Sequence, residues 1–97
     1  MIIVHDIFIC KPGNASKLAK KFKEAMAGNS ELVNILTDMT GDFNKVVMVT
    51  QYEDLAAYEQ TWKRYKQDTE TIKKMNEAMA GYQDMYATGS REIYQVW

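Results

Sequence analysis

Residues 45–53 predict a β-strand with apolar side chains on both faces, and this pattern limits the folds open to the chain. Side chains alternate along a strand, so Val46 and Met48 fall on the face opposite to Val47. Residues 2–10, IIVHDIFIC, predict a second strand of the same kind. An antiparallel sheet covered by helices on one side normally presents a polar second face to water. Two strands with apolar side chains on both faces therefore require that both faces of the sheet be covered.

The rest of the chain predicts two further strands and three helices, each with its own start and stop signals. Strands are expected at residues 2–10, 32–39, 45–53 and 83–97, and helices at about 14–26, 54–67 and 69–80. Asp54 is a good N-cap for the second helix, and Asp68 or Thr69 for the third. Gly81 would end the third helix, and Gly89 with Ser90 predicts a bulge in the last strand.

The order of these elements is β-α-β-β-α-β, with an extra short helix before the last strand. This order is typical of the split βαβ, ferredoxin-like α+β fold, in which the antiparallel sheet has the spatial order 4-1-3-2. We therefore expect one domain over residues 1–97, with its helices on one face of the sheet. A single helix over residues 55–79 that forms a coiled coil is the alternative, because its apolar residues also follow a heptad spacing.

The second apolar face of the sheet predicts a homodimer. Apolar surface left in water costs roughly 25 cal/mol per Å², so several exposed strand residues would cost several kcal/mol. A large apolar patch on a small protein usually marks an interaction site. The simplest cover is a second copy of the same sheet related by a two-fold axis, which would give an eight-stranded barrel.

Composition and charge exclude several classes of partner. The net charge of −1 provides no field for nucleic acid or for an acidic membrane surface. No run approaches the ~20 apolar residues of a membrane span, and no signal peptide is recognisable. Cys10 is the one cysteine, so no internal disulfide can form, and its apolar strand favours a buried thiol. We expect a cytoplasmic protein.

Two stretches resemble a known family. The run TDMTGDFNKVVMVTQYEDLAAYEQTW and the opening MIIVHDIFICKPGNASKLAKKFKEA are similar to the NIPSNAP-like and antibiotic-biosynthesis-monooxygenase-like branch of the dimeric α/β-barrel superfamily. The resemblance implies the fold and the dimer. It leaves the activity open, because the superfamily includes cofactor-free quinone-forming monooxygenases, haem-degrading enzymes, muconolactone isomerases and members without an assigned role.

His5 and Asp6 are the candidates for moving a proton. They are neighbours on one strand and therefore point to opposite faces, so they cannot form a simple pair with each other. A functional His5 would face either the space under the helices or the dimer barrel, and a neutral core histidine is the alternative. Asp6 would be costly to bury alone, and Arg91 on the last strand is its expected partner.

An aromatic group is expected where the third strand meets the second helix. Its members are Tyr52, Tyr58, Trp62 and Tyr65. The superfamily resemblance implies a ligand pocket of this kind between sheet and helices, and plain core packing is the alternative. Asn34, a polar residue on the second strand, and Arg91 on the last strand are further candidates for binding a substrate. One histidine and one cysteine give no zinc-site spacing, so neither a metal nor another cofactor is expected.

The sequence thus predicts a small homodimeric protein that binds a small apolar or aromatic molecule. Monooxygenase-type chemistry without a cofactor, with His5 or Asp6 moving the proton, is the most concrete enzymatic version. The alternative is a non-catalytic dimeric binding module of the NIPSNAP-like or stress-responsive kind. Whether the protein is an enzyme is left open by the sequence.

Overall fold

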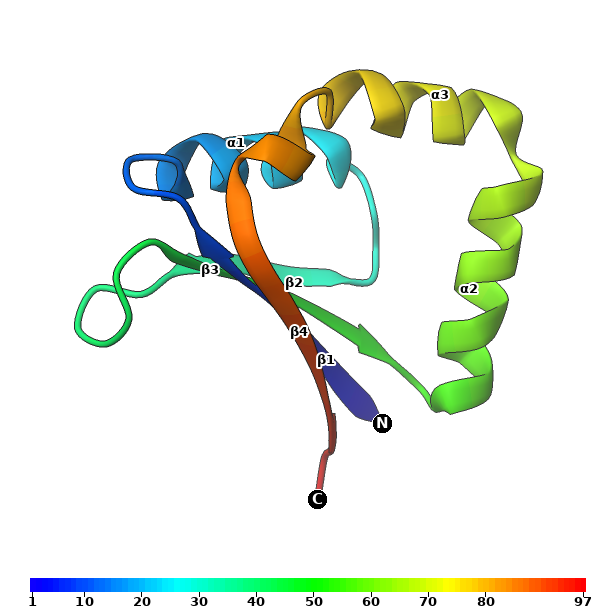
Figure 1. Cartoon of the computed structure of the whole chain (residues 1–97). Helices are drawn as coiled ribbons and strands as arrows, with labels where there is room; N and C mark the ends of the chain where they lie inside the picture. Colours follow the sequence, from blue (N-terminus) through cyan, green and yellow to red (C-terminus); the bar gives the residue numbers. More distant parts are fainter.

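A computed structural model describes all residues, 1–97. The elements in chain order are β1 (Ile2–Cys10), α1 (Ala15–Ala25), β2 (Leu32–Thr37), β3 (Lys45–Tyr52), α2 (Leu55–Gln67), α3 (Thr69–Ala78), a short 3-10 helix (Tyr82–Asp84) and β4 (Tyr86–Gln95). The four strands form one antiparallel sheet in the order β2-β3-β1-β4, as the sequence predicted. Helices α1 and α3 lie over one face of the sheet, and α2 stands beside it (Figure 1). The α+β ferredoxin-like fold is confirmed.

The core lies between α1 and the central strands. Cys10, Leu18, Phe22 and Val46 are buried together, with Leu18 and Val46 fully inaccessible. Leu18 and Phe22 are one turn apart on α1, so both point down onto the sheet. Cys10 on β1 and Val46 on β3 point from the sheet toward α1. Their side of the sheet is therefore the face that the helices cover.

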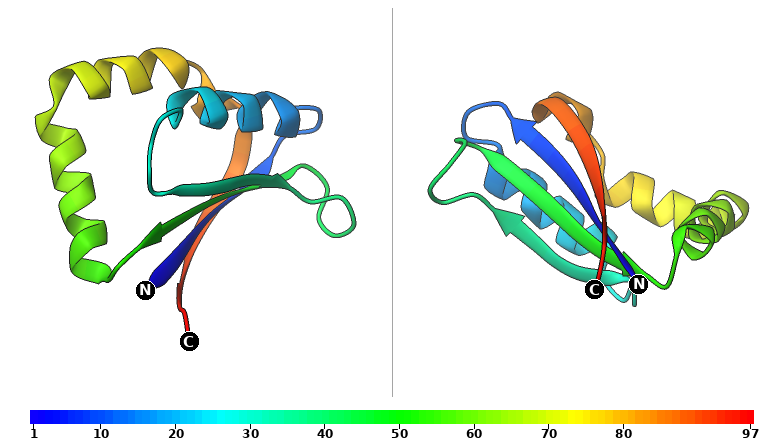
Figure 2. Two further views of the ribbon diagram at one scale, coloured as in Figure 1. Left: turned by 180° about the vertical axis from the view of Figure 1, so that it is seen from behind. Right: turned by 90° about the horizontal axis from the view of Figure 1, so that it is seen from below.

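A break at Asp68 separates α2 from α3. Asp68 has an extended backbone, with ψ of 96°, and its side chain accepts a hydrogen bond from Thr71 N at 3.2 Å. Asp54 caps α2 in the same way, accepting from Ala57 N at 2.8 Å. The two helices consequently meet at a sharp corner (Figure 2). The prediction of two separate helices is confirmed, and the alternative of one long coiled-coil helix is excluded.

The last strand corrects two further predictions. It starts at Tyr86 rather than residue 83, because Met85 N still bonds to Tyr82 O at 3.0 Å within the 3-10 turn. The register shift lies at the Ile9/Cys10 step of β1, opposite the start of β4, and pairing is continuous through Gly89 and its neighbours. The bulge thus falls where β4 leaves the turn and not at Gly89, whose backbone is not left-handed.

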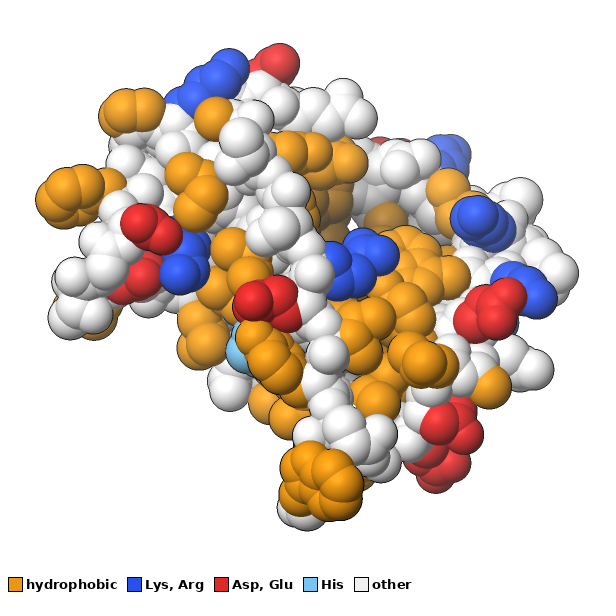
Figure 3. Space-filling model, turned by 60° about the horizontal axis from the view of Figure 1, so that its bottom comes forward, with side chains coloured by type: hydrophobic (Ala, Val, Ile, Leu, Met, Phe, Trp, Pro, Cys, Tyr) orange, Lys and Arg blue, Asp and Glu red, His pale blue; other side chains and the backbone are white.

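The other face of the sheet carries no helix. Seen from below, the strands lie in front of α1 (Figure 2, right). Ile3, Ile7 and Val47 are half-buried on this face, and Leu36 and Tyr94 are 45% and 47% exposed. Hydrophobic side chains spread across this side of the molecule (Figure 3). We call this surface the open face. Among the helices, none combines the length and the apolar character that crossing a membrane requires.

Candidate functional site

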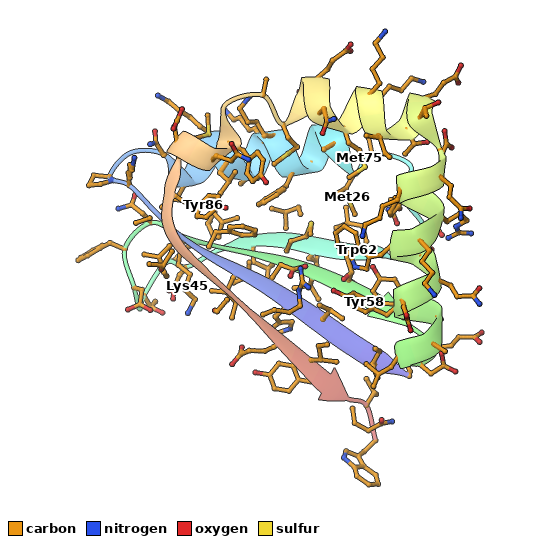
Figure 4. All side chains as sticks on the ribbon, turned by 45° about the vertical axis from the view of Figure 1, so that its right-hand side comes forward. Met26, Lys45, Tyr58, Trp62, Met75 and Tyr86 are labelled. Atoms are coloured by element: carbon orange, nitrogen blue, oxygen red, sulfur yellow. The ribbon has the colours of Figure 1, made fainter.

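A cavity of about 470 Å³ lies between the helix-covered face of the sheet and the corner formed by α2 and α3. Strands β1, β3 and β4 supply its floor, and the three helices supply its walls. Tyr58 and Trp62 point into it from α2, with Met75 and Met26 above them and Tyr86 at the far end (Figure 4). The sharp break at Asp68 creates this space, because α2 turns away from α1 instead of continuing beside it.

The aromatic side chains form a continuous wall along β3 and α2. Tyr52 contacts Tyr58 edge to face, with ring centres 5.0 Å apart. Tyr58 and Trp62 follow at 6.3 Å, and Trp62 and Tyr65 at 6.5 Å, again nearly perpendicular. Residues 58, 62 and 65 share one face of α2 because they are spaced by four and three. The four predicted aromatic residues therefore do line one cavity.

Asp6 and Arg91 form an ion pair on the cavity floor. They are paired directly across β1 and β4, and Arg91 Nε donates to Asp6 Oδ1 at 2.5 Å. The Asp6 side chain is 8% exposed and that of Arg91 is 49% exposed. The hydrogen bond to Asp6 raises the pKa of Arg91. The guanidinium carbon also lies 5.9 Å from the ring centres of both Tyr58 and Trp62, a cation–π distance.

The tyrosine hydroxyls of the wall differ in their partners. Tyr65 Oη accepts a hydrogen bond from Asn29 Nδ2, in the loop between α1 and β2. Tyr58 Oη is buried and makes no hydrogen bond of normal geometry, and the guanidinium of Arg91 is its nearest polar neighbour. Burial raises the pKa of both Tyr52 and Tyr65, so these phenols stay protonated at neutral pH. The cavity therefore offers hydroxyl donors, and its acidic group, Asp6, is held by Arg91.

Two predicted site residues lie elsewhere. His5 projects from β1 to the open face, where its ring contacts Tyr94 at 5.1 Å. Asn34 is paired with Val49 next to a register shift in β2 and is exposed. The structure thus brings Asp6, Tyr52, Tyr58, Trp62, Tyr65 and Arg91 together around one cavity and places His5 and Asn34 away from it.

Several lining residues were not predicted from the sequence. Thr50 and Met48 share a β3 face with Tyr52, so strand alternation alone could have identified them. Phe8 follows in the same way from Asp6 on β1. Asn76 on α3 lies three residues before Met79 on the same helical stripe, so its spacing could have identified it. Methionines 26, 48, 75 and 79 complete the apolar lining.

A second hollow, of about 540 Å³, lies between the ends of β3 and α2 and has a different character. Its walls include Glu31, Glu53 and Arg64, with an Arg64–Glu31 ion pair at 3.5 Å. This surface is polar, and seven of its ten lining residues are not hydrophobic. The aromatic cavity, with apolar walls and a few polar groups, is the better match to a small-molecule site.

The arrangement of sheet and helices places the chain in the ferredoxin-like α+β class, and known proteins identify the family. The NIPSNAP family model matches residues 7–88, which is most of the chain. The protein therefore belongs to the NIPSNAP family. Among curated proteins there is no match.

Solved structures agree with this assignment. An uncharacterised NIPSNAP domain protein from Burkholderia xenovorans has a TM-score of 0.81 at 13% identity, covering 100% of this chain and 95% of that one. A NIPSNAP family protein from Agrobacterium tumefaciens has a TM-score of 0.77 at 12% identity, with 97% and 90% covered. An antibiotic-biosynthesis-monooxygenase-like protein from Nitrosomonas europaea has a TM-score of 0.65 at 12% identity, with 99% and 98% covered. At these identities the likeness is one of fold.

Proposed function

We propose that the protein is a homodimer that holds a small, largely apolar or aromatic molecule in the cavity between the sheet and the α2–α3 corner. The observation that carries this proposal is the cavity itself. Its volume of about 470 Å³ lies within the ~300–1,000 Å³ that is usual for ligand sites. Its walls are aromatic and thioether side chains, and its floor has one ion pair that can orient a polar group.

The methionines support a binding site rather than a filled core. A cavity occupied by Met26, Met75 and Met79 would indicate a simple packed module. Instead, all three line the cavity and leave its centre free. Flexible thioether side chains adapt to the shape of an apolar guest, and this suits a site that must close around a ligand.

The open face supports the dimer. Its half-buried Ile3, Ile7 and Val47, together with Leu36 and Tyr94, remain in contact with water in a single copy. A second sheet placed against this face would cover them, and the two cavities would lie on the outer sides of the resulting barrel. His5 would then belong to the interface between copies, where its ring already packs on Tyr94.

Monooxygenase-type chemistry is the second candidate, and Asp6 favours it as a carboxylate in the cavity. Against it, Asp6 is engaged by Arg91, and His5 lies across the sheet from any ligand. Oxygen uptake with reduced quinols by the parent, Asp6→Asn and His5→Ala separates the two candidates. If the protein only binds a ligand, neither the parent nor either variant should consume oxygen. Uptake that only Asp6→Asn abolishes would establish catalysis.

Methyl-labelled methionine tests the binding site directly. Four of the seven methionines, 26, 48, 75 and 79, line the cavity, while Met1, Met39 and Met85 do not. Titration with ethylbenzene, an apolar aromatic probe, should shift the methyl signals of the first group and leave the second group in place. Shifts confined to Met1, Met39 or Met85, or no shifts at all, would contradict the proposal.

A further inference from the structure

We infer that the cavity takes a flat aromatic molecule with a ring N–H group, of the indole or pyrrole class, and that this N–H donates to Asp6 Oδ2. The inference rests on the proposed binding function and adds the chemical class of the ligand. The Asp6 carboxylate carries it, because Asp6 lines the cavity and the protein uses only one of its two oxygens.

Asp6 Oδ2 is an acceptor without a protein partner. Oδ1 accepts from Arg91 Nε at 2.5 Å, whereas no protein group donates to Oδ2. A carboxylate has about four acceptor sites, so most of them stay unused. Tyr58 Oη is the one fully covered side-chain oxygen that lacks a hydrogen bond of normal geometry. Asp6 Oδ2 therefore keeps part of the 8% of the side chain that is exposed, on the floor of the cavity.

The donors beside Asp6 are already in use. Arg91 Nε donates to Asp6, and the rest of its guanidinium is the nearest polar neighbour of the covered Tyr58 hydroxyl. A ligand atom that must accept a hydrogen bond finds no partner here, whereas one that donates finds Oδ2. A ring N–H meets this need, because it donates without bringing a lone pair that requires a donor in return. A hydroxyl group would bring such lone pairs with it.

Charge favours a neutral donor over an ammonium group. Asp6 and Arg91 are the acid and the base of the cavity lining, and their formal charges cancel. A bound cation would lie in an apolar space beside the Arg91 guanidinium, with no charge left to balance it. An indole N–H donates to the carboxylate without this penalty. Its flat ring can contact Tyr58 and Trp62, which point into the cavity (Figure 4).

Three bicyclic probes of nearly equal size test the inference through the methyl signals of the cavity methionines. Indole has a ring N–H, indene has no polar atom, and benzoxazole has acceptors but no donor. Each is titrated into the parent, Asp6→Leu and the matched control Asn76→Leu. Asn76 is the other lining residue that has a side-chain carbonyl, and it lies on α3 instead of the sheet. A thermal melt checks that both variants fold, and Arg91 in Asp6→Leu can be solvated because it is half-exposed.

We expect Asp6→Leu to weaken indole about tenfold relative to indene, the value of one hydrogen bond to a charged group. Asn76→Leu should leave the ratio of the two affinities within about twofold of the parent. In the parent itself, indole should bind more tightly than benzoxazole, and this comparison needs no variant.

An unchanged ratio of indole to indene affinity in folded Asp6→Leu, or a loss of the same size in Asn76→Leu, overturns the ligand class. Benzoxazole that binds the parent as tightly as indole overturns it too. In each of these cases, binding of indene in the cavity keeps the proposed function. If none of the three probes shifts the cavity methyl signals, the proposed function fails as well.

Discussion

Arg91 Nε on β4 and Asp6 Oδ1 on β1 lie 2.5 Å apart, and this contact joins the edge strand to the central strand on the floor of the cavity. Replacing Arg91 with methionine should leave the buried Asp6 carboxylate without a partner. We expect a loss of about 2–3 kcal/mol in the free energy of unfolding, less than for a fully buried pair because Arg91 is half-exposed. Urea denaturation of the parent and the variant measures this loss in the free energy of unfolding.

The double variant Asp6→Asn with Arg91→Gln is the control for this prediction. It removes both charges, so no uncompensated carboxylate remains, and it should recover a large part of the loss. If the double variant is as unstable as Arg91→Met, the cost comes from lost packing and the ion-pair explanation is wrong.

Asp68 at the break between α2 and α3 should make stability depend on pH. The hydrogen bonds from the Thr71 hydroxyl and backbone N–H lower the pKa of Asp68. Because the folded pKa lies below the unfolded value of about 3.9, the stabilisation is present above about pH 4 and disappears as the pH falls through the folded pKa. Asp68→Ala should therefore lower the melting temperature by a few degrees at pH 7, and the difference from the parent should shrink below about pH 4.

Glu77→Ala is the matched control on α3. Glu77 is exposed and takes part in no hydrogen bond or ion pair through its side chain. Its replacement should leave the melting temperature near that of the parent at both pH values. A difference between Asp68→Ala and the parent that stays constant from pH 7 to pH 3 would contradict the capping role.

Gly81 should resist substitution, because it has φ of 80° between α3 and the 3-10 turn. An alanine there must adopt the left-handed conformation, which costs about 1–2 kcal/mol. Gly89→Ala is the control, since Gly89 lies in β4 and an added Cβ would meet Ile7 O at an ordinary 3.6 Å. Denaturation of both variants measures the contrast, and equal losses would refute the conformational explanation.

Much of the fold follows from short-range signals in the sequence. The alternation of side chains along β1 and β3 predicted which residues share a face of each strand. The N-caps at Asp54 and Asp68 predicted where α2 and α3 begin. The partnership of Asp6 with Arg91 followed from burial cost and strand order, and it is confirmed. These features depend on residues near one another in sequence or directly paired across strands.

The placement of His5 could not be decided in that way. Both faces of β1 are apolar, so the pattern separated His5 from Asp6 without saying which face the helices cover. Packing of Leu18 and Phe22 against Cys10 and Val46 makes that choice, and it is a long-range event. The side on which Asn34 lies was harder still to predict, because the register shift in β2 changes which of its residues face the same side as Val49.

Matched substitutions at Leu36 and Met39 test whether the open face is an interface between two copies of the chain. Leu36 lies on this face, while Met39 lies beyond the end of β2 and is 93% exposed. Leu36→Glu should weaken association, because it would place a charge between two apolar sheets. Met39→Glu introduces the same charge away from the sheet and should leave association unchanged. Equal behaviour of the two variants would place the interface elsewhere.

Sedimentation equilibrium of the unaltered chain at micromolar concentration tests the central claim, that a sheet apolar on both sides is covered by helices above and by a second copy below. The account predicts a particle of twice 11.2 kDa, with Leu36→Glu shifted toward the single-chain mass. A particle of 11.2 kDa for the unaltered chain at that concentration would contradict it.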